Sequence, residues 1–489
     1  MTKKLSALIE DAGYTVSRGP LQADITSLVY DSRKSVAGSL FVAMPGAKAD
    51  GTAYIPQAVE NGAVAVVAEK EVDLPEGVSL ILADDSREAL ARLSAAWFSH
   101  PADKIKVIGI TGTKGKTTTT YMIKSILENA GRKVGLIGTI EAIIGDKHIP
   151  SLNTTPESYI VQEYLSQMVD KGIEIAVMEV SSQALKLHRV SGMTFEIGIF
   201  TNISPDHIGP AEHKDFAEYL YCKSLLFRQC RHGIFNADDK ELEEILKGHT
   251  CTVNTYAIEN DADFKAEDIR LVHRPGYLGV DYRVSGRENF PVTIDVPGRF
   301  SVYNSLCAIA VCHFFGVEAS AMQKALKAAR VKGRIEMIHV SDDFALMIDY
   351  AHNAMALESL LSTIREYNPG RIVTVFGCGG NRSKLRRYEM GEVSGRLSDF
   401  TIITSDNPRF EKPLDIIKDI ETGIKKTDGK YIEIPDRKEA IRYAIENGQK
   451  GDVIILAGKG HEDYQEIKGV KHPMDERVLI KEVLEELKG

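Results

Sequence analysis

Short runs of β-branched and other apolar residues alternate along the sequence with longer stretches in which apolar positions recur at helical spacing. The short runs are typical of buried strands, and the longer stretches are typical of helices that cover a sheet. This alternation predicts an α/β protein with mostly parallel sheets. The predicted strands are residues 63–68, 105–110, 175–178, 197–201, 372–376, 401–404 and 453–456.

Two interruptions of this pattern predict domain boundaries. At residues 99–103, a helix that carries Trp97 and Phe98 ends before a proline and a new strand begins. At residues 331–334, a predicted helix (319–329) ends before a pair of strands. We therefore expect three domains, residues 1–100, 101–332 and 333–489. In the second of them, the polar stretch 256–289 alternates as antiparallel strands do.

The strongest chemical signal is a glycine-rich turn between a predicted strand and a predicted helix. Such a turn directs backbone N–H groups and a helix N-terminus at one anion. Lys116 would add positive charge against nucleotide phosphates, and the Thr117 hydroxyl would ligate Mg²⁺. The strict Walker spacing requires glycine at position 110, which is isoleucine, so the loop is a shorter variant. We interpret it as an ATP-binding loop, with a simple glycine turn as the alternative. Its residues are Gly112, Thr113, Lys114, Gly115, Lys116, Thr117 and Thr118.

Composition narrows the class of protein. The chain has 489 residues, 43% of them hydrophobic and 26% charged, which is ordinary for globular proteins and excludes disorder, collagen and coiled coil. The formal net charge of −9 argues against a nucleic-acid binder held by phosphate contacts. No apolar run approaches the ~20 residues of a membrane helix. Because no signal peptide is apparent either, we expect a cytoplasmic protein without membrane partners. The six cysteines lack zinc-ligand spacing, so we expect them only to pack.

The glycine-rich loop resembles that of the Mur ligases, ATP-dependent enzymes that form amide bonds in peptidoglycan precursor synthesis. Further motifs of this family follow in order along nearly the whole chain. They read Asp-Ser-Arg at 31–33, Leu-Phe-Val-Ala-Met-Pro-Gly at 40–46, Asp-Gly at 50–51, Asn-Thr-Thr-Pro at 153–156, Glu-Val-Ser-Ser-Gln-Ala at 179–184, Asn-Ile-Ser-Pro-Asp-His at 202–207, Asp-Tyr-Ala-His-Asn at 349–353, Asp-Asn-Pro-Arg at 406–409 and Gly-Lys-Gly-His-Glu at 458–462. The resemblance implies a P-loop-type central ATP-binding ligase domain between an N-terminal UDP-sugar-binding α/β domain and a C-terminal Rossmann-like amino-acid-binding domain.

Two further residues stand where metal ligands are expected. Glu179 and His207 follow predicted parallel strands, at whose carboxyl ends ligand sites form. Oxygen and imidazole ligands suit Mg²⁺ or Mn²⁺. The alternatives are a solvated strand-end acid for Glu179 and a helix-capping or packed histidine for His207.

Lys223 carries no signature of its own, and its neighbours alone indicate a surface lysine on an amphipathic helix. The resemblance implies instead a carbamylated lysine that helps to hold a second metal ion. The segment 208–213, Ile-Gly-Pro-Ala-Glu-His, is about two residues longer than is usual in the family, which affects this alignment.

The resemblance also implies a UDP-sugar carrying a short peptide as acceptor. Ser32 and Arg33 would bind its uracil and pyrophosphate end, where the alternative for Arg33 is a surface salt bridge. Hydroxyls and an arginine suit a multiply anionic ligand. The residues expected at the peptide end are Asn153, Thr154, Thr155, Ser181 and Arg189. Gln183 stands where histidine is common in the family, and we assign it no role.

Asn304, Arg334 and His352 match family positions that contact ATP. Arg334 lies at the predicted hinge, so domain closure would bring its guanidinium to the phosphates and exclude water. Asn353 replaces the more usual threonine, and Ser301 replaces the more usual asparagine.

The incoming amino acid would be bound by loops that follow successive strands. Arg382 and Arg409 would grip its carboxylate, and in the family arginine at the last position of the 406–409 motif goes with meso-diaminopimelate. Loop capping is the alternative role of Arg409. Glu462 would neutralise the distal ammonium group. The full set expected here is Arg382, Asp406, Asn407, Pro408, Arg409, Gly458 and Glu462.

Together these matches imply a monomeric ATP- and Mg²⁺-dependent ligase that adds meso-diaminopimelate to UDP-N-acetylmuramoyl-L-alanyl-D-glutamate through an acyl phosphate. The same reaction with L-lysine is the first alternative, because residues 381–385 resemble some lysine-adding relatives. A folylpolyglutamate synthetase would not need the first domain. A nucleotide switch that makes no bond would not need Glu179, His207, Lys223 and Arg409.

Overall fold

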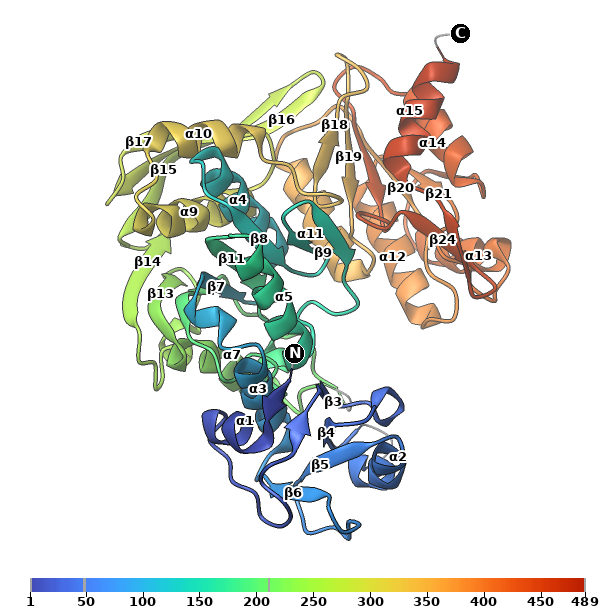
Figure 1. Cartoon of the computed structure of the whole chain (residues 1–489). Helices are drawn as coiled ribbons and strands as arrows, with labels where there is room; N and C mark the ends of the chain where they lie inside the picture. Colours follow the sequence, from blue (N-terminus) through green and yellow to red (C-terminus); the bar gives the residue numbers. More distant parts are fainter. Residues whose placement is uncertain (1, 47–49, 210–211, 488–489) are drawn as a thin grey trace. The chain divides into compact units, whose positions relative to one another are not determined.

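The computed structural model describes residues 2–46, 50–209 and 212–487 (Figure 1). The chain forms two compact units. The first comprises Met1–Tyr256 with Asn260–Ala262, and the second comprises Ala257–Glu259 with Asp263–Gly489.

The first unit begins with a small sheet in which all neighbouring strands are parallel, in the order β3-β4-β5-β6. Apolar residues of its strands and helices, among them Leu8, Val67 and Leu90, form one core. Asp85 starts the third helix by accepting from two backbone N–H groups of its first turn. The elements are β1 (Lys3–Lys4), α1 (Leu5–Asp11), β2 (Asp24–Ile25), β3 (Ser27–Val29), β4 (Ser39–Val42), α2 (Ile55–Glu60), β5 (Ala63–Ala68), β6 (Ser79–Leu82) and α3 (Ser86–Trp97), with 3₁₀ turns at Ser32–Lys34, Gly51–Tyr54 and Pro101–Asp103.

A larger, mostly parallel sheet follows in the same unit, in the order β10-β9-β8-β11-β7-β12-β13-β14. Its elements are β7 (Lys106–Thr111), α4 (Lys116–Asn129), β8 (Val134–Ile137), β9 (Glu141–Ile144), β10 (Lys147–Pro150), α5 (Ser158–Asp170), β11 (Ile175–Glu179), α6 (Ser182–Lys186), β12 (Phe195–Phe200), α7 (Phe216–Ser224), a 3₁₀ turn (Leu225–Arg228), β13 (Cys230–Asn236), α8 (Leu242–Ile245) and β14 (Thr252–Ala257). The β8–β9 and β9–β10 pairs are antiparallel, so only β9 runs against the other strands of this order.

The register of the central strands places the chemistry at one edge of this sheet. Glu179, the last residue of β11, pairs with Ile110 of β7, and Phe200, the last residue of β12, pairs with Thr111. The turn after β7 and the segments after β11 and β12 therefore begin side by side.

The second unit begins with three antiparallel strands, in the order β15-β16-β17, and two helices. These elements are β15 (Phe264–Arg274), β16 (Tyr277–Gly286), β17 (Phe290–Ile294), α9 (Arg299–Phe314) and α10 (Ala319–Ala328). Antiparallel strands within 256–289 are thus confirmed.

The remainder of the second unit is a six-stranded sheet in the order β18-β19-β23-β20-β21-β22, parallel except for β18. Apolar residues of its strands and of α14 and α15 form a further core. The elements are β18 (Glu336–Ile338), β19 (Ala345–Asp349), α11 (Ala354–Arg365), β20 (Ile372–Phe376), α12 (Lys384–Leu397), β21 (Phe400–Ile403), α13 (Pro413–Ile424), β22 (Tyr431–Glu433), α14 (Arg437–Glu446), β23 (Val453–Ala457), the hairpin β24 (Tyr464–Ile467) and β25 (Val470–Pro473), and α15 (Glu476–Glu486).

The α/β class with mostly parallel sheets is confirmed. Every strand predicted from the sequence is present, with ends shifted by at most two residues. Each of these strands is a nearly continuous apolar run because helices or neighbouring elements cover both of its faces.

Candidate functional site

The predicted nucleotide loop lies between β7 and α4. Gly112 has a φ of +148°, and a Cβ atom there would lie 1.9 Å from the hydroxyl oxygen of Thr201, so only glycine fits. Asn202, in the segment after β12, forms hydrogen bonds with the loop. Its backbone oxygen accepts from Thr113 N at 2.8 Å, and its side-chain oxygen accepts from Lys114 N at 2.9 Å. The loop is therefore already shaped around the N-terminus of α4.

Two lysine ammonium groups meet at the carbonyl oxygen of Gly112. Lys116 Nζ lies 2.9 Å from this oxygen, and Lys223 Nζ lies 2.8 Å from it. Lys223, on α7, is only 1% exposed, and its Nζ lies 4.5 Å from the ring centroid of Tyr219. Burial, followed by the positive charge of Lys116, holds the pKa of Lys223 well below its ordinary value. The interpretation of Lys223 as a surface lysine is therefore wrong.

Glu179 is 1% exposed and is enclosed by hydroxyl groups. Its carboxylate accepts from the Thr117 hydroxyl at 3.0 Å, and from both the backbone N and the hydroxyl of Thr139 at 2.9 Å. The Thr139 hydroxyl oxygen lies 3.1 Å from that of Thr154. The alternative of a solvated strand-end acid is therefore wrong for Glu179.

His207 lies after β12, outside any helix, and its side chain is half exposed. Its Nδ1 lies 2.9 Å from Glu212 Oε1, and its ring centroid lies 6.1 Å from that of Tyr219. The Tyr219 hydroxyl is 3.0 Å from the Thr113 hydroxyl, and its ring faces Lys223. Tyr219 thus joins His207 to the loop and to the buried lysine.

The donor atoms around Glu179 fit one Mg²⁺ ion. Thr117 and Glu179 offer hydroxyl and carboxylate oxygens, and Mg²⁺ commonly combines one or two protein oxygens with nucleotide phosphates. Near His207, the Lys223 amine would become a metal ligand only after conversion to a carbamate. Within residues 2–46, 50–209 and 212–487, no group of three or more His, Cys, Asp or Glu residues is gathered as for a metal ion. Pro210 and Ala211, in the segment singled out from the sequence, lie outside the described residues.

Three of the residues predicted for the acceptor peptide form a hydrogen-bonded group beside Glu179. The Thr155 hydroxyl donates to the backbone oxygen of Glu179 at 2.9 Å and accepts from Ser181 N at 3.0 Å. Arg189 donates to the backbone oxygen of Thr155 at 3.1 Å. Asn153, which precedes Thr154 in the sequence, is exposed to solvent.

Ser32 and Arg33 belong to the same unit. They lie in the 3₁₀ turn that follows β3. Ser32 donates to the side chain of Gln57 at 2.6 Å. Arg33 is 79% exposed and forms a bidentate pair with Asp31, at 2.9 and 2.8 Å. The salt bridge that the sequence left open is therefore present, and an anionic ligand of Arg33 would compete with Asp31.

The other residues predicted for ATP belong to the second unit. Asn304 is buried on α9. The Arg334 guanidinium lies 4.9 Å from the ring centroid of Tyr350. His352 places its Nδ1 2.8 Å from the backbone oxygen of Tyr350, and the two ring centroids are 4.6 Å apart. Tyr350 thus brings Arg334 and His352 together.

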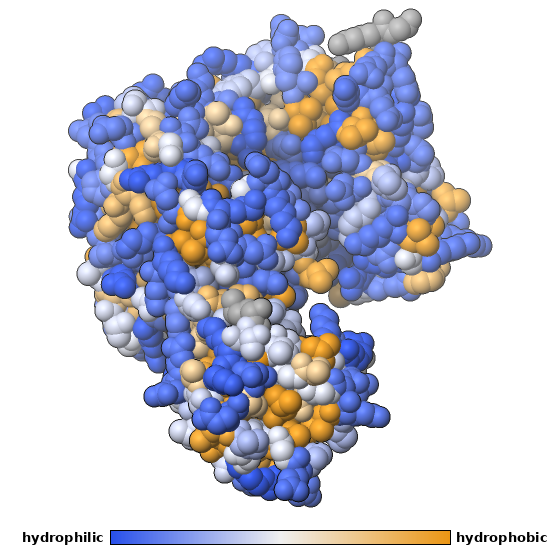
Figure 2. Space-filling model, viewed as in Figure 1, coloured by the Kyte–Doolittle hydropathy of each residue, from blue (hydrophilic) through white to orange (hydrophobic). Residues whose placement is uncertain are grey.

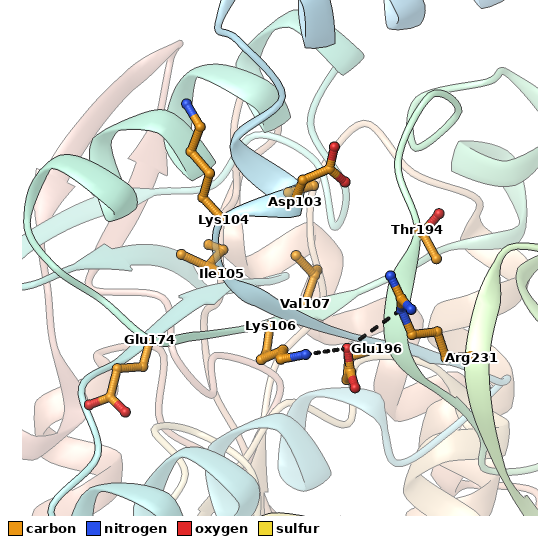
Figure 3. Close-up of a pocket in the computed structure, with 10 residues that line it drawn as sticks. Asp103, Lys104, Ile105, Lys106, Val107, Glu174, Thr194, Glu196 and Arg231 are labelled. Carbon is orange, nitrogen blue, oxygen red and sulfur yellow. Dashed lines mark hydrogen bonds and ion pairs between the residues drawn. The ribbon is translucent and has the colours of Figure 1, made fainter.

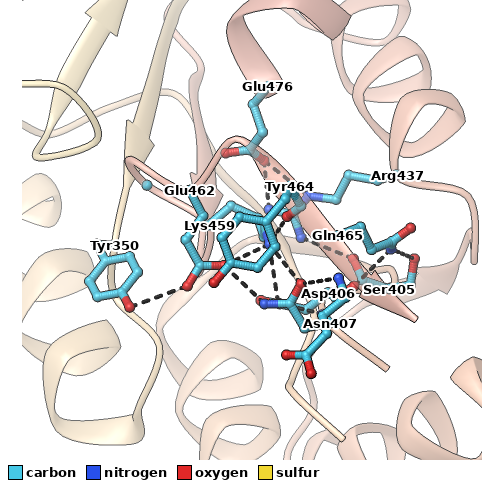
Figure 4. Close-up of polar contacts among 12 residues, drawn as sticks. Tyr350, Ser405, Asp406, Asn407, Arg437, Lys459, Glu462, Tyr464, Gln465 and Glu476 are labelled. Carbon is cyan, nitrogen blue, oxygen red and sulfur yellow. Dashed lines mark hydrogen bonds and ion pairs between the residues drawn. The ribbon is translucent and has the colours of Figure 1, made fainter. Parts of the chain in front are cut away.

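Residues predicted for the amino acid gather around Lys459 (Figure 4). Lys459 is fully buried, and its Nζ lies 2.7 Å from Glu462 Oε2, 3.0 Å from Asn407 Oδ1 and 3.8 Å from Asp406 Oδ1. Tyr350 donates to the other oxygen of Glu462 at 3.3 Å. Burial alone would raise the pKa of Glu462, but the charge of Lys459 and the hydrogen bonds from Lys459 and Asn407 outweigh it and lower the pKa. Glu462 thus already has a positive partner within the protein.

The two predicted arginines approach the same glycine. A Cβ atom on Gly379 would lie 3.0 Å from a terminal nitrogen of Arg409 and 3.8 Å from Cγ of the exposed Arg382. Arg409 also pairs with Glu466 at 3.0 Å and donates to the backbone oxygen of Gly380 at 2.8 Å. These contacts of Arg409 join its own loop to the neighbouring loop. They agree with loop capping, the alternative role of Arg409. Pro408, the residue before Arg409, is buried. Gly458 follows β23 and has a φ of +108°.

Ion pairs of one buried arginine join these loops. Arg387, on α12, is 1% exposed and donates to Glu411 at 2.8 and 2.7 Å and to Asp419 at 2.9 Å. Glu411 also accepts from the backbone N of Asn381. Arg387 lowers the pKa of Glu411 to about 2. The loops that carry Arg382 and Arg409 are therefore joined by charge.

A cavity of about 370 Å³ in the first unit lies away from this chemistry (Figure 3). Its lining includes Lys106, Glu174, Glu196 and Arg231, at or near the amino ends of β7, β11, β12 and β13. Glu196 lies 2.8 Å from Lys106 and 3.7 Å from Arg231. Because the nucleotide loop and Glu179 lie at the opposite ends of these strands, the cavity is not the candidate site.

Comparison with known proteins assigns three consecutive stretches of the chain to one family. The sequence matches the family models Mur ligase family, catalytic domain (residues 24–98), Mur ligase middle domain (110–312) and Mur ligase, glutamate ligase domain (333–460). It is 44% identical, over 99% of both chains, to the UDP-N-acetylmuramoyl-L-alanyl-D-glutamate--2,6-diaminopimelate ligase of Caldanaerobacter subterraneus subsp. tengcongensis. The chain belongs to the Mur ligase family.

Two further Mur ligases extend this comparison. A Clostridium acetobutylicum protein with the same name, numbered 1, is 44% identical over 99% of this chain and 100% of its own. The chain is also similar to a solved structure of a UDP-N-acetylmuramoyl-L-alanyl-D-glutamate--2,6-diaminopimelate ligase. The sequence identity is 27%, the match covers 100% of each chain, and the TM-score is 0.75.

Positions that depart from the usual Mur ligase pattern have local explanations. Asn353 caps α11 by accepting from Ala356 N at 2.9 Å, a role that the more usual threonine also fills. The Ser301 hydroxyl, in the first turn of α9, donates to the backbone oxygen of Pro297, just before the helix, at 3.0 Å.

Sequence reasoning missed four residues that shape this Mur ligase site: Thr139, Asn202, Tyr219 and Lys459. Asn202 and Lys459 lie within the quoted motifs and were available as candidates. Thr139 and Tyr219 belong to no such motif. Only the fold brings Thr139 to Glu179 and Tyr219 to Thr113, whereas Tyr219 and Lys223 are four residues apart on α7.

Figure 2 shows mainly hydrophilic residues on the visible face, with apolar residues in separate patches. Among the described residues, every helix is too short or too polar to cross a bilayer.

Proposed function

We propose that this Mur ligase uses ATP to join meso-diaminopimelate to the D-glutamate of UDP-N-acetylmuramoyl-L-alanyl-D-glutamate. The carrying observation is the full-length similarity to relatives whose names specify this dipeptide acceptor and 2,6-diaminopimelate. L-lysine, which the sequence left open, is the competing outcome of the test.

The proposed reaction has two steps. An oxygen of the acceptor side-chain carboxylate attacks the γ-phosphorus of ATP, and ADP leaves. The amine of the diamino acid then attacks the resulting acyl phosphate, the amide bond forms, phosphate leaves and the amine loses a proton. Lys116 stabilises the charge on the transferring phosphoryl group, a role supported by its position on the preformed loop.

We propose that Thr117 and Glu179 hold Mg²⁺, with support from their 3.0 Å contact. When bound, the ion supplies charge that screens the triphosphate from the acceptor carboxylate. His207 and a carbamylated Lys223 form the second metal site in this proposal. Carbamylation joins CO₂ to the neutral lysine amine with loss of a proton, and the lowered pKa of the buried Lys223 favours that neutral amine.

The acceptor would lie in the first unit, with Thr154, Thr155, Ser181 and Arg189 at its peptide end and Ser32 and Arg33 at its nucleotide end. Support comes from the group that links Thr155, Ser181 and Arg189 beside Glu179. Asn153 completes this proposed set.

Arg334, Asn304 and His352 would contact ATP from the C-terminal part of the chain, and Arg382 and Arg409 would bind the carboxylate of the amino acid. Asp406, Asn407, Pro408, Gly458 and Glu462 line the proposed pocket for its other end. The ranges matched by the family models support the division into domains 1–100, 101–332 and 333–489.

Substrate omission tests the ligase activity. Phosphate release from ATP and Mg²⁺ is expected only when UDP-N-acetylmuramoyl-L-alanyl-D-glutamate and the diamino acid are both present. Release that is equally fast without either substrate would identify an ATPase switch instead.

A further inference from the structure

Lys459 is a fully buried lysine of the second unit, and the reaction scheme above gives it no role. A buried ammonium group is costly unless charges and hydrogen bonds surround it. Lys459 meets this requirement, because its Nζ contacts Glu462 at 2.7 Å, Asn407 at 3.0 Å and the backbone oxygen of Tyr464 at 2.5 Å.

These contacts join loops from separate strands. Asn407 follows β21, whereas Lys459 and Glu462 follow β23, and β20 lies between these two strands in the sheet. The Lys459 side chain therefore ties the two loops together across the carboxyl end of β20. Figure 4 shows Lys459 among Asp406, Asn407 and Glu462.

Lys459 also determines which way the Asn407 amide points. An ammonium group only donates, so the amide oxygen must face it. The same oxygen accepts from Glu466 N at 2.8 Å, and the amide nitrogen donates to Glu462 Oε2 at 2.9 Å. With Lys459 in place, the orientation of Asn407 and one oxygen of Glu462 are both fixed.

The charges of these residues also fit a diamino acid as ligand. Asp406 and Glu462 bring two carboxylates to the pocket, and Lys459 brings one ammonium group, 3.8 and 2.7 Å away from them respectively. The formal charges of these three residues sum to −1, which suits one ammonium group of a diamino acid.

We propose that Lys459 is a positioning residue for the incoming diamino acid, which acts by fixing Glu462 and Asn407. The inference rests on the proposed function, which places the amino acid in this pocket. Lys459 itself need not touch the substrate.

A double-mutant cycle of Lys459→Met and Glu462→Gln tests this role. Phosphate release is measured with saturating acceptor, while meso-diaminopimelate and ATP are varied in turn. Lys459→Met is expected to raise the diaminopimelate KM about tenfold or more, since a lost hydrogen bond to a charged group has this effect. The ATP KM should stay within about twofold. Because Lys459 acts through Glu462, adding Lys459→Met to Glu462→Gln should change the diaminopimelate KM little further.

Several outcomes would overturn the inference. They are an unchanged diaminopimelate KM in Lys459→Met, a parallel rise of both KM values, or effects of the two substitutions that simply multiply. If Lys459→Met does not fold, the same cycle is run with Lys459→Arg, whose larger guanidinium keeps the charge but not the three short contacts, and the same criteria apply.

Arg371→Lys is the matched control. Arg371 pairs with the buried Asp452 at 2.5 Å just before β20, at the opposite end of the same sheet. This variant should lose stability without a change in the diaminopimelate KM. Failure of the proposed function is distinguishable, because it would appear in the wild type. If the wild type uses L-lysine instead, the same cycle is measured with that amino acid.

Discussion

Lys116 and Lys223 both donate a hydrogen bond to the carbonyl oxygen of Gly112, at 2.9 and 2.8 Å. Burial, followed by repulsion from the positive charge of Lys116, lowers the pKa of Lys223. Lys116, which is only partly buried, suits a cation that meets phosphate, and the fully enclosed Lys223 suits a neutral amine. The two lysines therefore have different expected roles.

Lys116→Ala should lower kcat by about a hundredfold or more, because one preorganised positive group that faces the transferring phosphoryl is lost. Steady-state phosphate release measures the effect. Lys124→Ala on the same helix is the control, since Lys124 pairs with Glu128 on its own helix and should leave kcat unchanged. A Lys116→Ala enzyme with normal turnover would remove Lys116 from the chemistry.

Lys223→Ala should be inactive, and short carboxylic acids should restore part of its activity. The substitution leaves a space in which a free carboxylate replaces the proposed carbamate. The measurement is phosphate release in formate, acetate or propionate, with folding checked by circular dichroism. Lys116→Ala is the matched control, because an added anion cannot replace its cation. Absence of rescue in folded Lys223→Ala protein would argue against carbamylation.

Arg409→Ala should raise the KM for meso-diaminopimelate about tenfold to a hundredfold, the range expected for one lost hydrogen bond to a charged group. The KM for ATP should change little, because the substitution lies in the proposed amino-acid pocket. Arg396→Ala is the control, since Arg396 pairs with Glu358 on the surface. An unchanged diaminopimelate KM would leave Arg409 with its loop-bridging role alone.

Glu411 gives a pH-dependent prediction for stability. Arg387 lowers its pKa from 4.5 in an ordinary environment to about 2 in the folded protein. A depressed folded-state pKa stabilises the protein above the ordinary value, and this contribution is lost as the pH falls through the folded-state pKa. The difference in unfolding free energy between the wild type and Glu411→Gln should therefore shrink from pH 4.5 towards pH 2. Denaturant titrations across this range provide the measurement, and a constant difference would contradict the assigned ion pair.

Local patterns predicted the strands and the nucleotide loop because apolar runs and glycine spacing act over a few residues. The burial of Lys223 was not predictable in this way, since its partner Gly112 is 111 positions away in the sequence. Thr139 reaches Glu179 from 40 positions away through the pairing of β8 with β11. Likewise, the motif that contains Lys459 suggested Gly458 and Glu462 as ligand contacts, and only the side-chain packing revealed the lysine between them and Asn407.

The most direct test compares meso-diaminopimelate with L-lysine as the added amino acid. The purified protein is supplied with ATP, Mg²⁺ and UDP-N-acetylmuramoyl-L-alanyl-D-glutamate, and phosphate release and the mass of the UDP-linked product are measured. A strong preference for meso-diaminopimelate, with a tripeptide product of the matching mass, is the predicted result. Preference for L-lysine would contradict the assigned amino acid, and no product with either would contradict the assigned acceptor.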